Sequence, residues 1–342
     1  MEITMKSTLK SIFLAFVVSL PFVVQAETLS PAAAEALYLK AKSLLNRGYH
    51  EGRALMKQAA EAGSTSAMCR WGAVNERNFI TGSRDEMAYW YQKAKEKGAA
   101  CGYIHTLGGN AVGEYINGDH DAGDEFIKKF TPLAENGDTD AMMALSIFYG
   151  LRREKGKEEE MTRLAAEAGV PRAMDELGEA ILRGSYGFYL FDENRQKEGL
   201  AWVQRSAMQG YDDAFSFLER YYTHQGNAEQ LFNWMEKGME MGHDGAIYIL
   251  YSLYAGQVDD DDKKYNLKLE PHIDKAKSYA CFYILLNSFH PKSNLYEIYH
   301  NDFEKYKKAG IYSPEDMKKG EAIGKEWLKT HQIYTDPSVW VD

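Results

Sequence analysis

Ala165-Ala-Glu-Ala-Gly169 is one of six similar segments that divide the chain into repeating units. The other five segments also end on a glycine, at Gly63, Gly98, Gly137, Gly210 and Gly242. Successive glycines are 35, 39, 32, 41 and 32 residues apart. A spacing in this range is typical of proteins built from stacked repeats, each of which is one small unit of secondary structure.

Apolar residues follow the glycines at fixed distances. An alanine comes four residues later in five units, and a large apolar residue eight residues later, at Ala67 and Trp71, Ala141 and Leu145, Ala173 and Leu177, Ala214 and Leu218, and Ala246 and Leu250. Tyr149, Tyr222 and Tyr254 lie four residues further on. Residues four apart share one face of a helix, so each unit begins with a helix that buries this stripe.

A second helix precedes each glycine. Trp90, Trp202 and Trp234 stand eight residues before their glycines and are predicted core residues of this helix. Helices commonly end on a left-handed residue, which glycine adopts without strain. The sequence therefore predicts an all-α fold, a right-handed superhelical α-solenoid of about seven helix-turn-helix repeats with a C-terminal capping helix pair.

The predicted solenoid covers residues 27–292, and capping helices with a tail cover residues 293–342. Further helices are expected at about 274–286, 294–309 and 314–330. Ser30-Pro31, Pro171 and Ser313-Pro314 have the residue types that begin helices. The length of 342 residues would by itself favour about two domains, but the repeats favour one continuous stack.

Residues 1–26 have the pattern of a secretory signal peptide. Lys6 and Lys10 precede an apolar run from Ser11 to Val24, and Val24-Gln25-Ala26 supplies small residues for cleavage. The run is shorter than the roughly 20 residues that span a bilayer. We therefore expect an exported, periplasmic protein without stable membrane insertion after cleavage.

Charge and cysteine content narrow the class of partner. Forty Lys and Arg against 50 Asp and Glu give a net charge of −10, which argues against nucleic acid as a partner. Cys69, Cys101 and Cys281 are the three cysteines. Cys69 and Cys101 lie in adjacent units, and export permits a disulfide, but three unpaired buried cysteines are the favoured expectation.

Several segments resemble Sel-one-like repeats (SLR), which are relatives of the tetratricopeptide repeat. They are Met87-Ala-Tyr-Trp-Tyr-Gln-Lys-Ala-Lys-Glu-Lys-Gly98, Lys197-Glu-Gly-Leu-Ala-Trp-Val-Gln-Arg-Ser-Ala-Met-Gln-Gly210 and Ala173-Met-Asp-Glu-Leu-Gly178. The resemblance covers about residues 31–330 and includes the predicted final capping helix. It implies an all-α superhelix that binds proteins, and it implies no enzyme activity.

The sequence contains no recognisable catalytic motif of the metalloprotease, P-loop, serine-hydrolase or dinucleotide-binding type. Asp119-His120-Asp121 and the run Asp259 to Asp262 are the segments that come nearest to metal-binding patterns. Both are interpreted as solvated loops, because neither completes a ligand set. No catalytic, metal-binding or cofactor-binding residue is predicted.

Aromatic residues that break the repeat pattern are the candidate partner-binding residues. One group is Tyr186, Phe188, Tyr189 and Phe191, in a connection that also contains Leu190. These residues either fold back onto the stack or form an exposed interaction site. The second group is Tyr221, Tyr248 and Tyr251. It either lines the superhelical groove or packs against a neighbouring repeat.

These observations leave three functional hypotheses. The leading one is a non-enzymatic periplasmic scaffold that binds a protein through its groove and aromatic loop. The family resemblance suggests an alternative, an immunity protein that neutralises a type VI secretion phospholipase or lipase effector. A cell-envelope hydrolase is the third.

Overall fold

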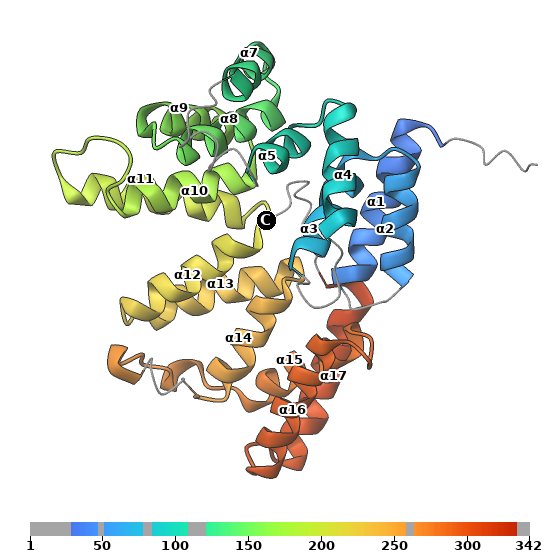
Figure 1. The fold of residues 1–342 in the computed structure, drawn as a ribbon. Coiled ribbons are helices and arrows are strands. Elements are labelled where there is room, and N and C mark those ends of the chain that lie inside the picture. Colours follow the sequence, from blue (N-terminus) through green and yellow to red (C-terminus); the bar gives the residue numbers. More distant parts are fainter. Residues whose placement is uncertain (1–28, 47–50, 78–83, 109–120, 258–262, 334–342) are drawn as a thin grey trace, which may run out of the picture.

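The computed structural model describes residues 29–46, 51–77, 84–108, 121–257 and 263–333, and these contain sixteen α-helices and no strand. The predicted all-α class is confirmed. Figure 1 shows the helices following one another as a curved stack of hairpins. The signal-peptide segment, Asp119-His120 and residues 259–262 lie outside the described residues, whereas Asp121 is the first residue of a described helix.

Fourteen of the described helices form the stack as seven successive pairs. They are α1 (Pro31–Asn46) with α2 (Glu51–Glu61), α3 (Thr65–Arg77) with α4 (Arg84–Glu96), α5 (Ala100–Gly108) with α7 (Asp121–Glu135), α8 (Thr139–Leu151) with α9 (Lys155–Glu167), α10 (Pro171–Leu182) with α11 (Asp192–Ala207), α12 (Asp212–His224) with α13 (Ala228–Met241), and α14 (Asp244–Tyr254) with α15 (Lys275–Ser288). Two short 3₁₀ helices, Lys263–Tyr265 and Glu270–His272, lie between α14 and α15. The chain continues with α16 (Asn294–Lys308) and α17 (Pro314–Thr330).

The six repeat glycines are the joints between pairs. All have positive φ angles, from 82° at Gly242 to 104° at Gly63. At Gly169 the backbone closes the end of α9 with two hydrogen bonds, from the Val170 amide to Ala165 (3.0 Å) and from the Gly169 amide to Ala166 (3.1 Å). This paired pattern ends a helix on a left-handed residue and frees the chain to begin the next one.

The predicted stripe of buried residues is also confirmed. The alanines, the large apolar residues and the tyrosines that recur after the glycines are all buried. Trp90 and Trp234 are buried as well, whereas Trp202 is only partly buried and lies beneath the Arg205 guanidinium. The three tryptophans are therefore not equivalent, although they occupy the same register.

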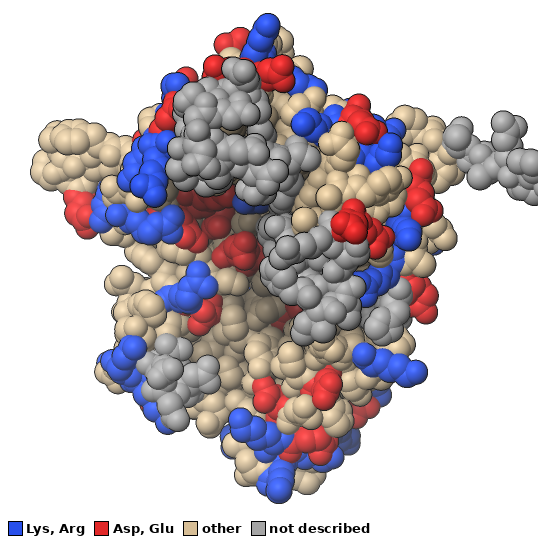
Figure 2. Space-filling model, in the orientation of Figure 1, with Lys and Arg blue, Asp and Glu red and all other residues tan. Residues whose placement is uncertain are grey.

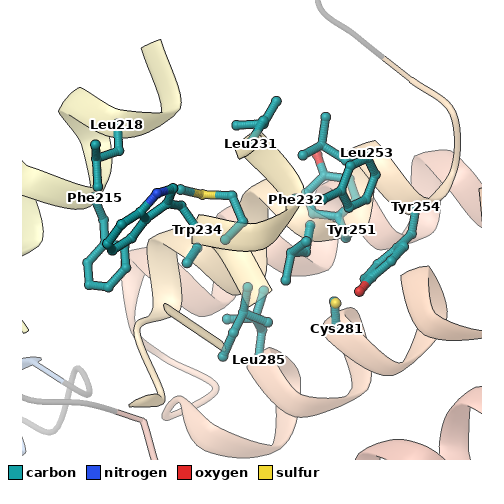
Figure 3. Close-up of a cluster of buried hydrophobic side chains, with 14 of the residues drawn as sticks. Phe215, Leu218, Leu231, Phe232, Trp234, Tyr251, Leu253, Tyr254, Cys281 and Leu285 are labelled. Atoms are coloured by element: carbon teal, nitrogen blue, oxygen red, sulfur yellow. The ribbon is translucent and has the colours of Figure 1, made fainter. Parts of the chain in front are cut away.

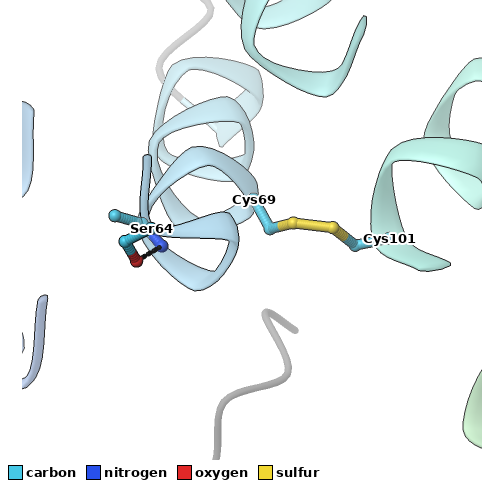
Figure 4. Close-up of a disulfide and its surroundings, with 4 residues drawn as sticks. Ser64, Cys69 and Cys101 are labelled. Carbon is cyan, nitrogen blue, oxygen red and sulfur yellow. Dashed lines mark hydrogen bonds between the residues drawn. A yellow bond between two sulfur atoms is a disulfide. The ribbon is translucent and has the colours of Figure 1, made fainter. Parts of the chain in front are cut away.

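A disulfide joins the second and third pairs. Cys69 of α3 and Cys101 of α5 are bonded, with 6.2 Å between their Cα atoms (Figure 4). The favoured expectation of three unpaired cysteines is wrong for these two, because the first helices of adjacent pairs bring them face to face. Cys281 of α15 is free and fully buried, and burial raises the pKa of its thiol.

The described side chains form three successive hydrophobic clusters. One lies within α1 to α5, the next runs from α5 to Tyr186, and the third extends from Val203 in α11 to Ile333. Figure 3 shows part of the third cluster, where side chains of α12, α13, α14 and α15 meet. Leu182 of α10 and Leu200 of α11 pack against the third cluster, whereas Trp202 of α11 packs against the second, so the two clusters meet at the α10–α11 pair.

Helices α10 and α11 pack tightly at this junction. A side-chain carbon on Gly178 would lie 2.6 Å from the Gly199 carbonyl oxygen, so glycine is required for this approach. The two helices therefore form a closely packed hairpin, and the connection between them lies at the end of that hairpin.

The last two helices close the stack in different ways. Helix α17 packs on α15, where a side-chain carbon on Gly320 would lie 2.5 Å from the Ala276 carbonyl oxygen. Ser313 caps α17 in a reciprocal arrangement with Asp316. Helix α16 instead covers α14, and Asp302 of α16 accepts hydrogen bonds from the Tyr248 and Tyr251 hydroxyls of α14. The predicted pair of terminal helices is present, within one residue of its expected bounds.

Candidate partner-binding surface

The connection between α10 and α11 divides its aromatic residues between the stack and solvent. Tyr186 is buried at the edge of the second cluster, and Tyr189 is partly buried against it. Phe188, Leu190 and Phe191 are exposed, by 88%, 81% and 68% respectively. The sequence left open whether these residues fold back onto the stack or are exposed. Both occur within this single loop.

Gly187 makes this division possible. Its φ is +73°, and a side-chain carbon there would lie 2.6 Å from the Tyr189 ring. Glycine therefore allows Tyr189 to fold back over the turn while Phe188 projects outward. Burial is the main cause that raises the pKa of Tyr189, and Glu198 raises it further.

Arg195 of α11 fixes the base of the loop. Its guanidinium donates to the Ile181 carbonyl oxygen at 3.2 Å and to the carbonyl oxygen of Leu182, the last residue of α10. Asp192 pairs with the same guanidinium. These contacts close the exposed end of α10 and anchor the loop to α11.

We call Phe188, Leu190 and Phe191 the apolar tip. Figure 1 shows their connection projecting beyond the ends of α10 and α11, and Figure 2 shows the same region as an uncharged lobe at the edge of the molecule. Their exposure contrasts with that of Tyr186, whose pKa burial raises. Tyr186 is therefore an anchor of the loop and not part of its exposed surface.

Tyr251 does not line an open groove. It is buried, its ring centroid lies 4.1 Å from that of Phe282, and its hydroxyl donates to Asp302 of α16 at 3.0 Å. Burial raises its pKa, as does the neighbouring Tyr248. Of the two interpretations of this residue, packing against a neighbouring element is the one that the structure supports.

Tyr248 and Tyr221 are less buried than Tyr251. Tyr248 is partly buried, and its hydroxyl donates to Asp302 at 2.7 Å, so α16 covers it too. Tyr221 of α12 is partly buried and stacks on Phe217, with 6.0 Å between ring centroids. Tyr221 is thus the member of the second group that α16 does not hold through Asp302.

Asp175 of α10 was not among the candidate residues, although the structure makes it conspicuous. It is 5% exposed, and its Oδ1 atom is buried without a hydrogen-bond partner. A signal for it exists in the sequence. Asp175 stands six residues after Gly169, at the register position that Cys69 and Met143 occupy after their own glycines.

Burial is the largest cause that raises the pKa of Asp175 to about 8, and the carboxylates of Glu179, Asp213 and Glu176 raise it further. The Arg220 guanidinium acts in the opposite direction. In the described part of the chain, no three His, Cys, Asp or Glu residues are grouped so that they could hold a metal ion. The helices described include none that is long and apolar enough to cross a membrane.

No family model matches the chain, and no curated protein matches it. Solved structures of similar shape include a protective antigen of uropathogenic Escherichia coli with an SLR fold, at 16% identity and a TM-score of 0.40. The match covers 90% of this chain and 62% of the antigen, so the chain spans less than two thirds of that protein.

Two further structures illustrate the range of similar proteins. A Sel1 repeat protein from Oxalobacter formigenes is 20% identical, with a TM-score of 0.36 over 68% of this chain and 99% of that one. An immunity protein from Pseudomonas aeruginosa is 17% identical, with a TM-score of 0.38 over 90% of each chain. Sel1 repeat proteins, the family that the sequence resembles, are thus among the similar structures.

Proposed function

We propose that this chain is a non-enzymatic periplasmic scaffold that binds a protein partner through the apolar tip. The scaffold is the stack of helix pairs. Among the described large apolar residues, the three residues of the tip have the most exposed side chains. The observation that carries the proposal is the exposure of Phe188, Leu190 and Phe191 on an anchored turn.

Exposure of this kind has a cost in water. Burying a large apolar side chain is favourable by roughly 1.5 to 3 kcal/mol, and three such residues side by side forgo that gain in the free chain. Contiguous exposed apolar residues are typical of interaction sites. Aromatic residues held by a rigid base also lose little conformational entropy on binding, which makes them effective anchors.

The periplasmic location rests on the sequence of residues 1–26 and on the chemistry of the cysteines. A disulfide such as Cys69–Cys101 persists in an oxidising compartment and is rare in the cytosol. Partner capture is therefore to be tested with periplasmic extract and with the oxidised chain.

The test replaces the tip without touching its anchors. Phe188→Ala combined with Phe191→Ala should weaken capture of the partner at least tenfold, because it removes two exposed aromatic anchors. The melting temperature should not change, because neither side chain is buried. Quantitative pull-down and thermal unfolding measure the two effects.

Leu39→Ala is the matched control, since Leu39 of α1 is an exposed apolar residue remote from the tip in sequence. It should leave capture unchanged. Equal capture by the tip variant and the wild type would contradict the proposal, as would a large loss of stability in the tip variant. Turnover of a cell-envelope substrate that survives the loss of binding would instead favour the hydrolase hypothesis.

The immunity hypothesis is a finer version of the same proposal, in which the partner is a toxic effector. It predicts that the exported chain protects cells from an effector directed to the periplasm, and that the tip variant does not. A captured partner that is harmless to such cells would leave the scaffold role and remove the immunity role.

A further inference from the structure

A buried carboxyl group lies on α10. Asp175 is in the second turn of that helix, and Asp213 and Arg220 of α12 are close enough to act on its carboxyl electrostatically. Asp175 is 95% buried, and its Oδ1 atom has no hydrogen-bond partner among the described residues. A polar group buried without a partner costs stability, so the fold itself gives no reason to keep an aspartate at this position.

Further carboxylates of α10 and α12 lie near Asp175. Glu179 is one turn further along α10, and Asp213 is in the first turn of α12. Both act on the carboxyl of Asp175 electrostatically, as does Glu176. Figure 2 shows acidic side chains gathered in the shaded hollow at the centre of the molecule, where Figure 1 places α10 and α12.

Arginines of the chain pair with two of these carboxylates. Arg172 pairs with Glu176 at 2.8 Å, and Arg183 pairs with Glu179. Neither pairs with Asp175. Of these carboxylates, Asp175 is therefore the one that would gain most from an added cation, because its Oδ1 atom has no hydrogen-bond partner.

We propose that Asp175 receives an arginine side chain of the partner, which enters between α10 and α12. This inference rests on the proposed partner-binding function and specifies a second contact for it. A guanidinium has five donors in a planar arrangement, so one group can reach Asp175 and a neighbouring carboxylate together. A single metal ion would need ligands converging on one point, whereas these carboxylates are spread over two helices.

The position of Asp175 suits a partner already held at the apolar tip. Asp175 precedes Leu182, the last residue of α10, by seven positions. Seven residues of helix span about 10 Å. A single protein surface can therefore cover both features, with an apolar pocket over the tip and an arginine over α10.

Binding at this site displaces a proton. The carboxyl of Asp175 is largely protonated at neutral pH, because burial and Glu176, Glu179 and Asp213 outweigh the effect of Arg220. A guanidinium favours the carboxylate form. The proton leaves to the buffer as the cation enters, and no other bond is made or broken.

The test uses the oxidised mature chain and N-acetylargininamide, whose only charge is the guanidinium. The wild type should bind this compound roughly fivefold more tightly at pH 8 than at pH 7, because the ionised fraction of a group with pKa about 8 rises by that factor. Calorimetry in two buffers of different ionisation enthalpy should show proton release. Asp175→Asn should abolish both effects, and Asp124→Asn, at an exposed position in α7, should leave them unchanged.

Equal affinity of the wild type and Asp175→Asn would overturn the proposal, and so would a wild-type affinity independent of pH. The pH series needs no variant, so it decides the matter even if Asp175→Asn fails to fold. Calcium binding that depends on Asp175 would also overturn it, in favour of a metal site. The tip variant should bind N-acetylargininamide normally, so failure of the tip contact and failure of this site give different results.

Discussion

Asp175 lowers the stability of the fold, although the proposed contact with an arginine requires its carboxyl group. Its pKa is about 8 in the folded chain, against an ordinary value near 3.8. Between these two pH values the folded chain holds a proton that the unfolded chain has lost. The contribution of Asp175 to stability is therefore greatest at the acid end of this window and falls as the pH rises through it. A residue that destabilises the fold near neutral pH is typical of a binding site.

Asp175→Asn should therefore stabilise the chain, and more so as the pH rises from 5 to 8. The advantage should grow by up to about 1.4 kcal/mol per pH unit, because the amide carries no charge to bury. Denaturant unfolding at pH 5 and pH 8 measures the difference. An advantage that is the same at both pH values would show that Asp175 does not titrate in this window, and Asp124→Asn serves as the control.

At the scale of the elements, the helix pairs depend on glycine joints. The effect of the left-handed backbone at such a joint can be measured separately from the effect of side-chain packing. Gly169 has a φ of +99° and open space where a side chain would be. Gly156 also has open space around it, but it lies within α9 and has an ordinary helical conformation. The two glycines thus differ in backbone conformation and not in crowding.

Gly169→Ala should destabilise the chain by about 1 to 2 kcal/mol, because alanine is strained at positive φ. Gly156→Ala should stabilise it by roughly 0.5 to 1 kcal/mol, because alanine is the better helix former. Chemical denaturation of both variants gives the two signs. A stabilising Gly169→Ala would mean that the joint is not left-handed in solution.

The elements that the sequence predicts best are those governed by local rules. The glycine joints, the buried stripe after each glycine and the bounds of α16 and α17 follow from spacing and capping along a short stretch of chain. The cover over Tyr251 does not, because Asp302 and Tyr306 lie more than 50 residues away on a helix outside the repeat. The sequence alone supplies no rule for where that helix packs.

The candidate site shows the same limit. Composition identified the aromatic loop, but the turn at Gly187 decides that Tyr189 folds back while Phe188 projects. Asp175 was missed because its burial depends on how neighbouring helices pack on α10, which the sequence of α10 alone does not determine. Its register position after Gly169 was a detectable signal, since a carboxylate there replaces residues that are buried in other repeats.

At the scale of the whole molecule, the described chain is a series of helix pairs with three hydrophobic clusters. One proposed contact lies on α10, and the other lies on the connection from α10 to α11. In such a stack each pair is stabilised mainly by its neighbours. The disulfide from Cys69 to Cys101 strengthens the stack near its beginning. The tightly packed α10–α11 hairpin holds the tip at a fixed place on this frame.

Site-specific crosslinking in the periplasm tests the central claim most directly. A photoreactive amino acid is placed at Phe188, at the exposed end of the tip, or at Leu39 on the first helix as a control. The account predicts one protein partner crosslinked from position 188 and none from position 39, with loss of the crosslink when Phe191 is also replaced by alanine. The same products from both positions, or none from position 188 while the partner is still bound, would contradict it.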